Sequence, residues 1–358
     1  MGLPTSRSGV PTPPSLLQVA GLVEARLTDL LDGEVVRWTA LTPDLAEPLA
    51  ALRALVMAGG KRLRPAFCFW GFVGAGGDPD DPAVIDAGAA FELLQAFALV
   101  HDDVMDGSAT RRGARTAHLA FGDRHQVEAW RGEGRRFGEG VAILIGDLAH
   151  VYADLLLRDA GREVLAVWDE LRIELNVGQY LDILGTARGD TDPEGARRIA
   201  RYKSGKYTIE RPLHVGAALA GRFDELRPVL SDYGDPLGEA FQLRDDILGA
   251  FGEGSVIGKP VGDDLREGKP TPLLAAASRA ADGAQQRVLA RIGSPDLQDA
   301  EIEAIQAVLH DTGALAEVES RIEQLATGAI DAIERADITD EARAALVDLA
   351  RFVAWRET

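Results

Sequence analysis

The chain has one cysteine, few aromatic residues and fewer basic than acidic residues. Because Cys68 is the only cysteine among 358 residues, no intrachain disulfide can form, which favours a reducing cytoplasm. Lysine and arginine total 38 against 57 aspartates and glutamates, which gives a net charge of −19. This balance argues against a general surface for nucleic acids or anionic membranes, so any anion site has to be a local basic cluster.

Signals for export and membrane insertion are also missing. The sequence has no charged-then-apolar signal peptide, and no apolar run comes close to the roughly 18 to 20 residues of a membrane span. We therefore expect a soluble cytoplasmic protein without stable membrane insertion. The first residues, MGLPTS, match the loose N-myristoylation pattern, but a disordered leader rich in proline and serine over residues 1–14 is the favoured interpretation.

No segment shows a convincing alternating β pattern, and there is no tandem repeat of fixed period. Apolar residues make up 46% of the chain, and their helical spacing predicts an all-α single domain over residues 15–358. The expected helices cover residues 15–32, 44–57, 83–105, 142–157, 164–184 and 226–251. Three or four more follow between residues 271 and 355, with a break at residues 293–295, whereas residues 119–140 are polar and irregular by pattern.

Acidic residues gather at the polar end of an expected long apolar helix. Asp102 and Asp106 share one helix face and Asp103 lies beside them, so three carboxylates crowd one patch. Like charges so placed repel, and Mg²⁺ bridging to phosphate oxygens is the natural cation to sit over them. Arg111 and Arg112 follow and suit fork-like contacts to a diphosphate. Taken alone, the segment is equally well explained as a solvated surface with loose ion pairs.

A second acidic patch and two basic segments complete the pattern. Asp245 and Asp246 again stand at the polar end of an apolar helix, before a glycine-rich loop over residues 258–271. The basic segments are KRLRP at residues 61–65, next to an expected helix N-terminus, and RYKSGKYT at residues 201–208. Two carboxylate walls with basic loops nearby suit a diphosphate held by Mg²⁺. The long apolar helices would then line a cavity for a hydrocarbon tail.

In their order these motifs resemble those of the trans-isoprenyl diphosphate synthases, close to the geranylgeranyl diphosphate synthases. The resemblance covers about residues 45–280 and rests on GGKRLRP, DDVMD with RRG, GD at 146–147, KS at 203–204, QLRDD and the paired GK motifs. It implies an isoprenoid-synthase-type helical bundle around a central cavity. The implied reaction is the Mg²⁺-dependent head-to-tail (1′-4) condensation of isopentenyl diphosphate with dimethylallyl, geranyl or farnesyl diphosphate.

The resemblance also assigns roles to individual residues. It implies three Mg²⁺ ions with substrate bound, held by Asp102, Asp106 and Asp245 and supported by Asp103, Asp246 and Asp264. The implied isopentenyl diphosphate site contains Lys61, Arg64, Gln95 and Arg112. The implied allylic diphosphate contacts are Arg111, Lys203, Ser204, Gln242, Lys259 and Lys269. The expected catalytic set is Asp102, Asp103, Asp106, Arg111, Lys203, Asp245 and Asp246.

The chain departs from the family pattern at three places. Gly249 stands where most members have a third aspartate, so one metal ion would be held more loosely, by Asp264 or by water. Ser204 replaces the commoner threonine. The chain end, Arg-Glu-Thr at residues 356–358, lacks the basic tail that some members use as a lid.

Product length in the family is set by bulky residues just upstream of the first acidic motif, which form a cavity floor. Phe97 lies five positions before Asp102, Ala98 follows it, and there is no two-residue insertion, which resembles enzymes that stop at the C20 product. Leu94 and Phe91, deeper along the same helix, would raise the floor and favour the C15 product, farnesyl diphosphate. Core packing is the favoured explanation for Phe91.

Two rival interpretations are weighed against a synthase. A class I terpene cyclase shares metal-dependent ionisation and an all-α fold, but it would not need GGKRLRP or the Arg112 side of a second diphosphate site. A catalytically silent regulatory subunit would be expected to lose acidic motifs, and only Gly249 hints at such a loss. The resemblance further implies a homodimer whose interface is made by long apolar helices.

Overall fold

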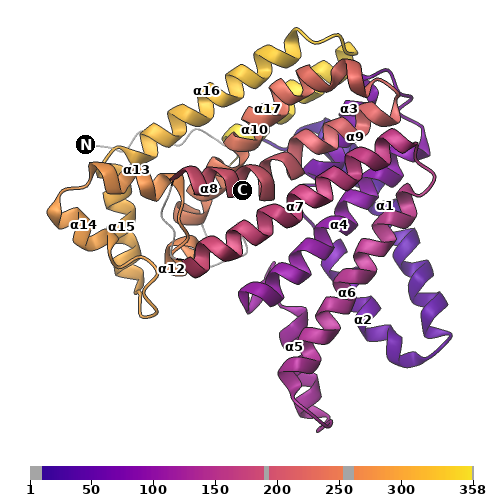
Figure 1. Cartoon of the computed structure of the whole chain (residues 1–358), viewed down its shortest axis with the longest axis horizontal. Helices are drawn as coiled ribbons and strands as arrows, with labels where there is room; N and C mark the ends of the chain where they lie inside the picture. The colour runs from indigo at the N-terminus through magenta and orange to yellow at the C-terminus, as the bar shows by residue number, and fades with distance from the viewer. Residues whose placement is uncertain (1–9, 189–192, 253–261, 357–358) are drawn as a thin grey trace.

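The described part of the fold is almost entirely helical, as the spacing of apolar residues predicts (Figure 1). A computed structural model describes residues 10–188, 193–252 and 262–356. In chain order the helical elements are α1 (Pro14–Thr39), η1 (Pro43–Leu45), α2 (Ala46–Met57), α3 (Leu63–Gly74), α4 (Pro82–Asp106), α5 (Ala117–Val127), α6 (Gly134–Leu157), α7 (Arg162–Arg188), α8 (Pro193–Ile199), η2 (Ala200–Glu210), α9 (Arg211–Leu219), α10 (Phe223–Phe251), α12 (Asp263–Glu267), α13 (Pro272–Ala280), α14 (Gly283–Leu289), α15 (Asp299–Asp311), α16 (Ala314–Glu334) and α17 (Asp340–Trp355).

Helix α4 runs through the core and carries the first acidic motif on its last turn. The Asp81 side chain caps its start, where Pro82 supplies a fitting first-turn residue, and Gly107 ends it in the left-handed conformation (φ 65°). Its middle is packed against other helices: Phe91 is fully buried and meets the Trp168 ring edge-on at 5.2 Å. The core thus anchors α4 and leaves its acidic end free to form a site.

A two-stranded hairpin, which the sequence did not suggest, follows α4 and is the β structure found among the described residues. The strands are β1 (Thr110–Arg111) and β2 (Ala114–Arg115), paired antiparallel. At the turn between them Arg112 and Gly113 have φ values of 53° and 76°, which glycine adopts freely and arginine rarely. The hairpin therefore sets the direction in which the two arginines leave the acidic end of α4.

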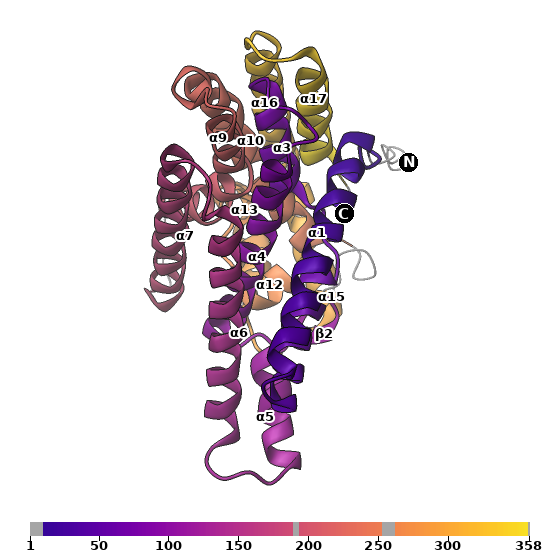
Figure 2. The same ribbon diagram turned by 90° about the vertical axis from the view of Figure 1, so that its right-hand side faces the viewer.

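The expectation that residues 119–140 are irregular is wrong. Most of them belong to α5 and to the first turns of α6, which pack along each other at the end of the molecule opposite α16 and α17 (Figures 1 and 2). This end has a small aromatic cluster of His125, Trp130 and Phe137, in which only His125 is buried, rather than a long apolar stripe. The apolar periodicity on which the prediction relied is therefore weak there.

The expectation of three or four helices after residue 271 is also too low, because five helices, α13 to α17, lie there. The extra break separates α13 from α14, where Asp282 begins the new helix with a capping box to Gln285. Alanines and glutamines continue the helical composition across this point, so the pattern alone does not show the break. The break predicted at residues 293–295 is confirmed.

Two helices, α4 and α6, are long and apolar enough to cross a membrane by length and mean hydropathy, so the expectation that no run approaches a span is wrong. The core helix of a soluble protein passes the same test, and 61% of the α4 window is buried. The α6 window is only 39% buried. Helix α6 and its neighbour α7 therefore present an exposed apolar face, made by Ile143, Leu144, Val151, Leu155, Ile173, Val177, Tyr180 and Ile183.

Candidate active site

The first carboxylate wall of the site is the last turn of α4. Asp102 accepts hydrogen bonds from Lys203 Nζ on η2 (3.2 Å) and from Gln179 Nε2 on α7 (3.0 Å). Arg111 on β1 donates from Nη2 to Asp102 (3.3 Å) and from Nε to Asp103 (2.9 Å). Three elements, η2, α7 and β1, thus bring side chains to Asp102, and these contacts join four of the predicted residues: Asp102, Asp103, Arg111 and Lys203.

The electrostatics of this wall favour an added cation. Loss of hydration raises the pKa of Asp103, and the hydrogen bond from Arg111 opposes this rise only in part. Loss of hydration also raises the pKa of Asp106, and the charges of Asp102 and Asp182 raise it further. The negative end of the α4 dipole adds to the repulsion. A cation placed over this turn would relieve all of these effects.

The second carboxylate wall lies on α10. Asp246 is buried and accepts a hydrogen bond from Gln242 Nε2 (2.9 Å). Burial raises its pKa to about 7, with Asp264 and Asp245 adding to the rise and Lys269 opposing it. Asp246 is thus poised to lose its proton when a further positive charge arrives.

Lys269, a predicted allylic contact, belongs to this second wall. Loss of hydration lowers the pKa of Lys269, but the carboxylates of Asp264, Asp246 and Asp182 outweigh this effect and raise it. Asp182 on α7 also acts on Asp106 of the first wall. The charge of Asp182 on α7 therefore acts on residues of both walls.

The Asp264 side chain lies against Gly249. A Cβ atom added there would lie 2.1 Å from Oδ2 of Asp264, which is closer than any real contact. The Asp264 carboxylate, carried by α12, therefore lies in the space where a third aspartate of the second acidic motif would begin.

The C-terminal segment reaches the second wall, a contact that the comparison of the chain end with the basic tail of other members did not anticipate. Arg356 is buried, its Nη2 donates to Oδ1 of Asp245, and its guanidinium lies 4.5 Å from the centre of the Phe241 ring. Lys61 lies nearby: burial lowers the pKa of its ammonium to about 8, and the charge of Arg356 contributes to this shift. The predicted isopentenyl site and the second wall therefore adjoin.

The predicted isopentenyl diphosphate residues form a basic group next to η2. Arg64 donates from Nη2 to Oγ1 of Thr208 (3.0 Å) and stacks over the Tyr207 ring at 4.3 Å. Arg112 donates from Nη1 to the Leu55 carbonyl (3.2 Å). Burial lowers the pKa of Arg112, and the charge of Arg64 adds to that effect.

Arg62, in the middle of the same basic segment, does something different. It is buried, and its guanidinium donates to Glu92, to Glu24 (3.2 Å) and to the Val56 carbonyl (2.8 Å). Its backbone is left-handed (φ 50°) at the start of α3. Arg62 therefore forms structural ion pairs inside the protein. Lys61 and Arg64 remain as the anion-binding candidates of this basic segment.

The remaining predicted residues have less defined surroundings. Gln95 is half-buried on α4, seven residues before Asp102 and so on the same face, and Ser204 is half-buried on η2. Lys259 lies outside the described residues.

The predicted chain-length residues divide into two groups. Leu94 and Phe91 are fully buried in the core. Phe97 and Ala98 are half-buried, and the Phe97 ring stacks on His150 of α6 at 4.7 Å. Phe97 therefore lies between α4 and α6.

Two residues at the site were not among the predicted site residues. Gln179 contacts Asp102, and Asp182 accepts from Lys203 Nζ (2.5 Å). They are three residues apart on α7, a spacing common on any solvated helix face. No signal in the sequence sets them apart, because only the fold brings α7 next to α4 and η2.

The carboxylates suit a metal ion that is shared with a diphosphate. Among residues 10–188, 193–252 and 262–356, no three carboxylate, imidazole or thiol groups are placed to hold a metal ion on their own. Mg²⁺ usually takes one or two carboxylates and completes its octahedron with water and substrate phosphates. Asp102 and Asp106 on one wall and Asp245 on the other fit this kind of site.

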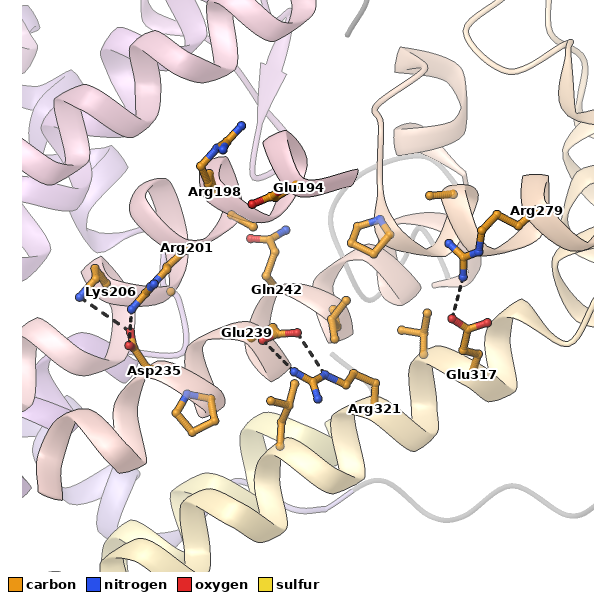
Figure 3. A pocket seen from close by; sticks show the side chains of 18 residues that line it. Glu194, Arg198, Arg201, Lys206, Asp235, Glu239, Gln242, Arg279, Glu317 and Arg321 are labelled. Carbon is orange, nitrogen blue, oxygen red and sulfur yellow. Dashed lines mark hydrogen bonds and ion pairs between the residues drawn. The ribbon is translucent and has the colours of Figure 1, made fainter. Parts of the chain in front are cut away.

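A separate cavity of about 540 Å³ lies between η2, α10, α13 and α16 (Figure 3). Ion pairs line it: Arg201 and Lys206 with Asp235 (2.5 and 3.8 Å), Arg321 with Glu239 (3.2 Å) and Arg279 with Glu317 (2.8 Å). None of the predicted metal ligands lines this cavity, and Gln242 is its one contact with the predicted site residues. It is therefore distinct from the predicted metal-binding carboxylates of α4 and α10.

Comparison with known proteins places this arrangement among characterised relatives. Residues 47–310 match the sequence model of the family described as polyprenyl synthetase. The geranylfarnesyl diphosphate synthase of Aeropyrum pernix is 32% identical over 329 residues, which are 89% of this chain and 96% of that protein. The (2E,6E)-farnesyl diphosphate synthase of Mycobacterium tuberculosis is 32% identical over 307 residues, which are 83% of this chain and 80% of that protein.

The fold is likewise similar to solved structures. A geranylgeranyl pyrophosphate synthase from Corynebacterium glutamicum, complexed with isoprenyl diphosphate and magnesium, superimposes with a TM-score of 0.87 at 38% identity. The superposition covers 95% of this chain and 99% of that one. The three relatives carry names for three different prenyl chains, so similarity alone does not select a product.

Proposed function

This chain belongs to the polyprenyl synthetase family and is a prenyltransferase, and on that premise we propose that it makes geranylgeranyl diphosphate. It does so by adding isopentenyl diphosphate to allylic diphosphates in head-to-tail (1′-4) steps. The observation that carries the proposal is the convergence of Arg111, Lys203 and Gln179 on Asp102, opposite the carboxylates of α10. Farnesyl diphosphate as the final product is the alternative.

The allylic diphosphate is held between the two carboxylate walls. Mg²⁺ ions, three with substrate bound, supply Lewis-acid stabilisation of the leaving pyrophosphate when Asp102, Asp106 and Asp245 hold them. Arg111 and Lys203 donate to Asp102, which places their positive charges where the diphosphate would bind. Negative charge grows on those oxygens as the allylic C–O bond breaks, so these fixed cations stabilise the transition state more than the substrate.

The second substrate lies beside the basic loop. Lys61, Arg64 and Arg112 bind the isopentenyl diphosphate and orient its double bond toward the allylic carbon. The double bond attacks the allylic carbocation and forms the new C–C bond. A proton then leaves the adjacent carbon to the pyrophosphate just released, so no protein nucleophile is required.

Product length is set by the residues behind the acidic motif. Phe97 is half-buried between α4 and α6, and with Ala98 it supports a floor at the C20 length. Leu94 is fully buried one turn deeper, where it packs the core. These placements favour a floor at Phe97 over one at Leu94.

The protein acts as a cytoplasmic homodimer without stable membrane insertion. The exposed apolar face of α6 and α7 supports the dimer, because burying that face against a second copy removes apolar area from water. The acidic balance of the chain, with a net charge of −19, opposes attraction to anionic lipids and nucleic acids.

Product analysis tests the proposal. Purified protein is incubated with Mg²⁺, labelled isopentenyl diphosphate and, in separate reactions, dimethylallyl, geranyl or farnesyl diphosphate, and the dephosphorylated products are sized. A dominant C20 alcohol is expected, and a C15 limit would move the floor to Leu94. Folded protein that elongates none of the primers would overturn the proposal and favour a silent regulatory subunit.

A further inference from the structure

The π-helix η2 carries groups for both halves of the site. Lys203, near its start, reaches Asp102 (3.2 Å), while Tyr207 and Thr208, near its end, contact Arg64. π-Helical hydrogen bonding is rare and mostly limited to single turns, often at functional sites, but here it covers the 11 residues of the element. Such a long stretch of unfavourable backbone geometry needs its surroundings to hold it in place.

Glycines on the two flanking helices bring η2 close to its neighbours. A Cβ at Gly178 of α7 would lie 2.6 Å from the backbone nitrogen of Lys203. A Cβ at Gly238 of α10 would lie 2.8 Å from the Cα of Gly205, and one at Gly234 would lie 2.8 Å from the Cα of Glu210. The backbone of η2 is therefore wedged between α7 and α10 along its length.

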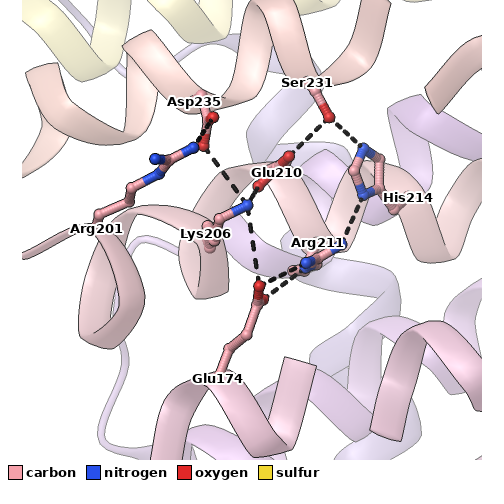
Figure 4. Close-up of polar contacts among 8 residues, drawn as sticks. All are labelled: Glu174, Arg201, Lys206, Glu210, Arg211, His214, Ser231 and Asp235. Atoms are coloured by element: carbon pink, nitrogen blue, oxygen red, sulfur yellow. Dashed lines mark hydrogen bonds and ion pairs between the residues drawn. The ribbon is translucent and has the colours of Figure 1, made fainter. Parts of the chain in front are cut away.

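A buried ionic cluster fills the centre of this wedge (Figure 4). The ammonium of Lys206 lies 2.5 Å from Glu210, 3.9 Å from Glu174 of α7 and 3.8 Å from Asp235 of α10. Ser231 of α10 donates to Glu210 (2.7 Å). Lys206 is 8% exposed, so this one charge links both flanking helices to η2 from inside the protein.

The two lysines of η2 use the same stripe of α7. Glu174, Gly178 and Asp182 follow one another at intervals of four residues, so they share one helix face and span about 12 Å. Lys206 faces Glu174 at one end, and Lys203 bonds to Asp182 at the other. Gly178 lies between them, against the Lys203 backbone. A shift of η2 along α7 would break both contacts together.

Stability alone does not account for a lysine at this place. A buried ion pair regains little net free energy after desolvation, and an apolar residue of similar size is often at least as stabilising. The charge instead fixes the position of η2 along α7 and α10. Lys206 contacts three carboxylates on three different elements, and only one position of η2 allows all three contacts.

We propose that Lys206 is a positioning residue, which holds η2 in the register where Lys203 reaches the allylic diphosphate. This inference rests on the proposed function of the site. The two ends of η2 differ in their dependence on Lys206: residues 205–210 are buried and continue into α9, whereas residues 201–204 are more exposed. Loss of Lys206 therefore displaces the Lys203 end more than the end that supports Arg64.

The test uses Lys206→Met, which removes the charge and keeps the length of the side chain. Because three carboxylates are then left with less compensation, Lys206→Met/Glu210→Gln is made alongside it to preserve folding. The matched control is Arg279→Met, which removes an exposed cation from the rim of the neighbouring cavity. Thr208→Val is the contrasting variant, since it removes the hydrogen-bond acceptor for Arg64 and leaves Lys206 in place.

In both Lys206 variants we expect the KM for the allylic diphosphate to rise about tenfold or more, with a KM for isopentenyl diphosphate within about twofold of wild type. Thr208→Val is expected to show the reverse selectivity, and Arg279→Met no change in either. Thermal unfolding is followed in parallel. Unchanged allylic KM in folded Lys206 variants, or equal losses for both substrates accompanied by a lower Tm, would show a purely structural role and overturn the inference.

A binding measurement separates this inference from the proposed function. If the wild-type protein elongates no primer, the proposed function fails, and Lys206 is then judged by calorimetric binding of inorganic pyrophosphate in the presence of Mg²⁺. Weaker pyrophosphate binding in both Lys206 variants, but not in Arg279→Met, supports the positioning role. Equal binding in all of the proteins rejects it.

Discussion

At the scale of single residues, the partly buried carboxylates of the site are compensated by nearby cations. Carboxylates on two walls are kept partly from water, and each has at least one cation near it: Arg111 and Lys203 at Asp102, Lys269 at Asp246 and Arg356 at Asp245. Removing or moving one of these charges changes the affinity of the others for a proton, a metal ion or a diphosphate.

Lys61 gives this balance a pH dependence. Its pKa is lowered to about 8, chiefly by burial, so the ammonium that attracts the diphosphate is lost as the pH rises through about 8. We expect kcat/KM for isopentenyl diphosphate, which reports the free enzyme, to fall above that pH. Lys61→Arg stays charged and should keep its kcat/KM at higher pH. A fall at the same pH in Lys61→Arg would assign the titration to another group.

Gly249 should be sensitive to the smallest possible substitution. In Gly249→Ala the new methyl group meets the Asp264 carboxylate, which has to move away from the second wall. The Mg²⁺ concentration needed for half-maximal activity is expected to rise. Gly328→Ala, with nothing within 4 Å of the added Cβ, is the matched control and should behave as wild type. An unchanged Mg²⁺ requirement in Gly249→Ala would remove Asp264 from the account of metal binding.

At this scale the sequence predicts what lies close together along the chain. Asp102, Asp103 and Asp106 share a helix turn, and their grouping follows from helical spacing alone. Gln179 and Asp182 could not be predicted, because the contact of Gln179 with Asp102 and that of Asp182 with Lys203 depend on how α7 packs against α4 and η2. Arg356 was missed for a related reason: it lies more than a hundred residues from Asp245, and nothing in its local sequence points to the site.

At the scale of elements, close helix crossings fix the relative positions of the helices that carry the site residues. Helices α3 and α9 approach so closely that a Cβ at Gly216 would lie 2.1 Å from the Cys68 carbonyl oxygen. Helix α3 begins at Leu63, within the basic segment, and α9 continues η2, so this crossing connects the two parts of the predicted isopentenyl site.

Substitution at this crossing should therefore be costly. Gly216→Ala is expected to lower the free energy of unfolding by about 1–3 kcal/mol, because backbone atoms have to move to admit the methyl group. Gly21→Ala, in α1 with nothing within 4 Å of its added Cβ, should instead be neutral or stabilising by roughly 0.5–1 kcal/mol. Urea unfolding midpoints compare the two variants. A Gly216→Ala midpoint equal to or above wild type would contradict the close crossing.

The elements themselves were predictable where an apolar stripe is long. Helices α4, α7 and α10 follow from the spacing of their apolar residues. Helix α5 was missed because its pattern is too polar for that spacing to stand out, and the β1–β2 hairpin because its strands are two residues each. The π-helical path of η2 depends on contacts with α7 and α10, which local sequence does not encode.

For the whole molecule, the exposed face of α6 and α7 predicts a dimer. Leu144 and Val151 are 63% and 53% exposed on α6, and two negative charges placed there should split the dimer. The double variant Leu144→Glu/Val151→Glu is expected to sediment near the 38.2 kDa of one chain, and the wild type is expected to sediment at twice that mass. Val36→Glu, at a residue that is 70% exposed on α1, should remain dimeric. A monomeric wild type at micromolar concentration would contradict the proposal.

The most direct test of the central claim measures pyrophosphate release and isopentenyl incorporation together, in wild type, Asp102→Asn and Asp245→Asn. Both substitutions remove a charge from one carboxylate wall and keep the shape of the side chain. We expect wild type to release one pyrophosphate for each isopentenyl unit that it incorporates, and each variant to lose about a hundredfold or more in rate. Full coupled activity in either variant would show that ionisation of the allylic diphosphate does not take place between these two walls.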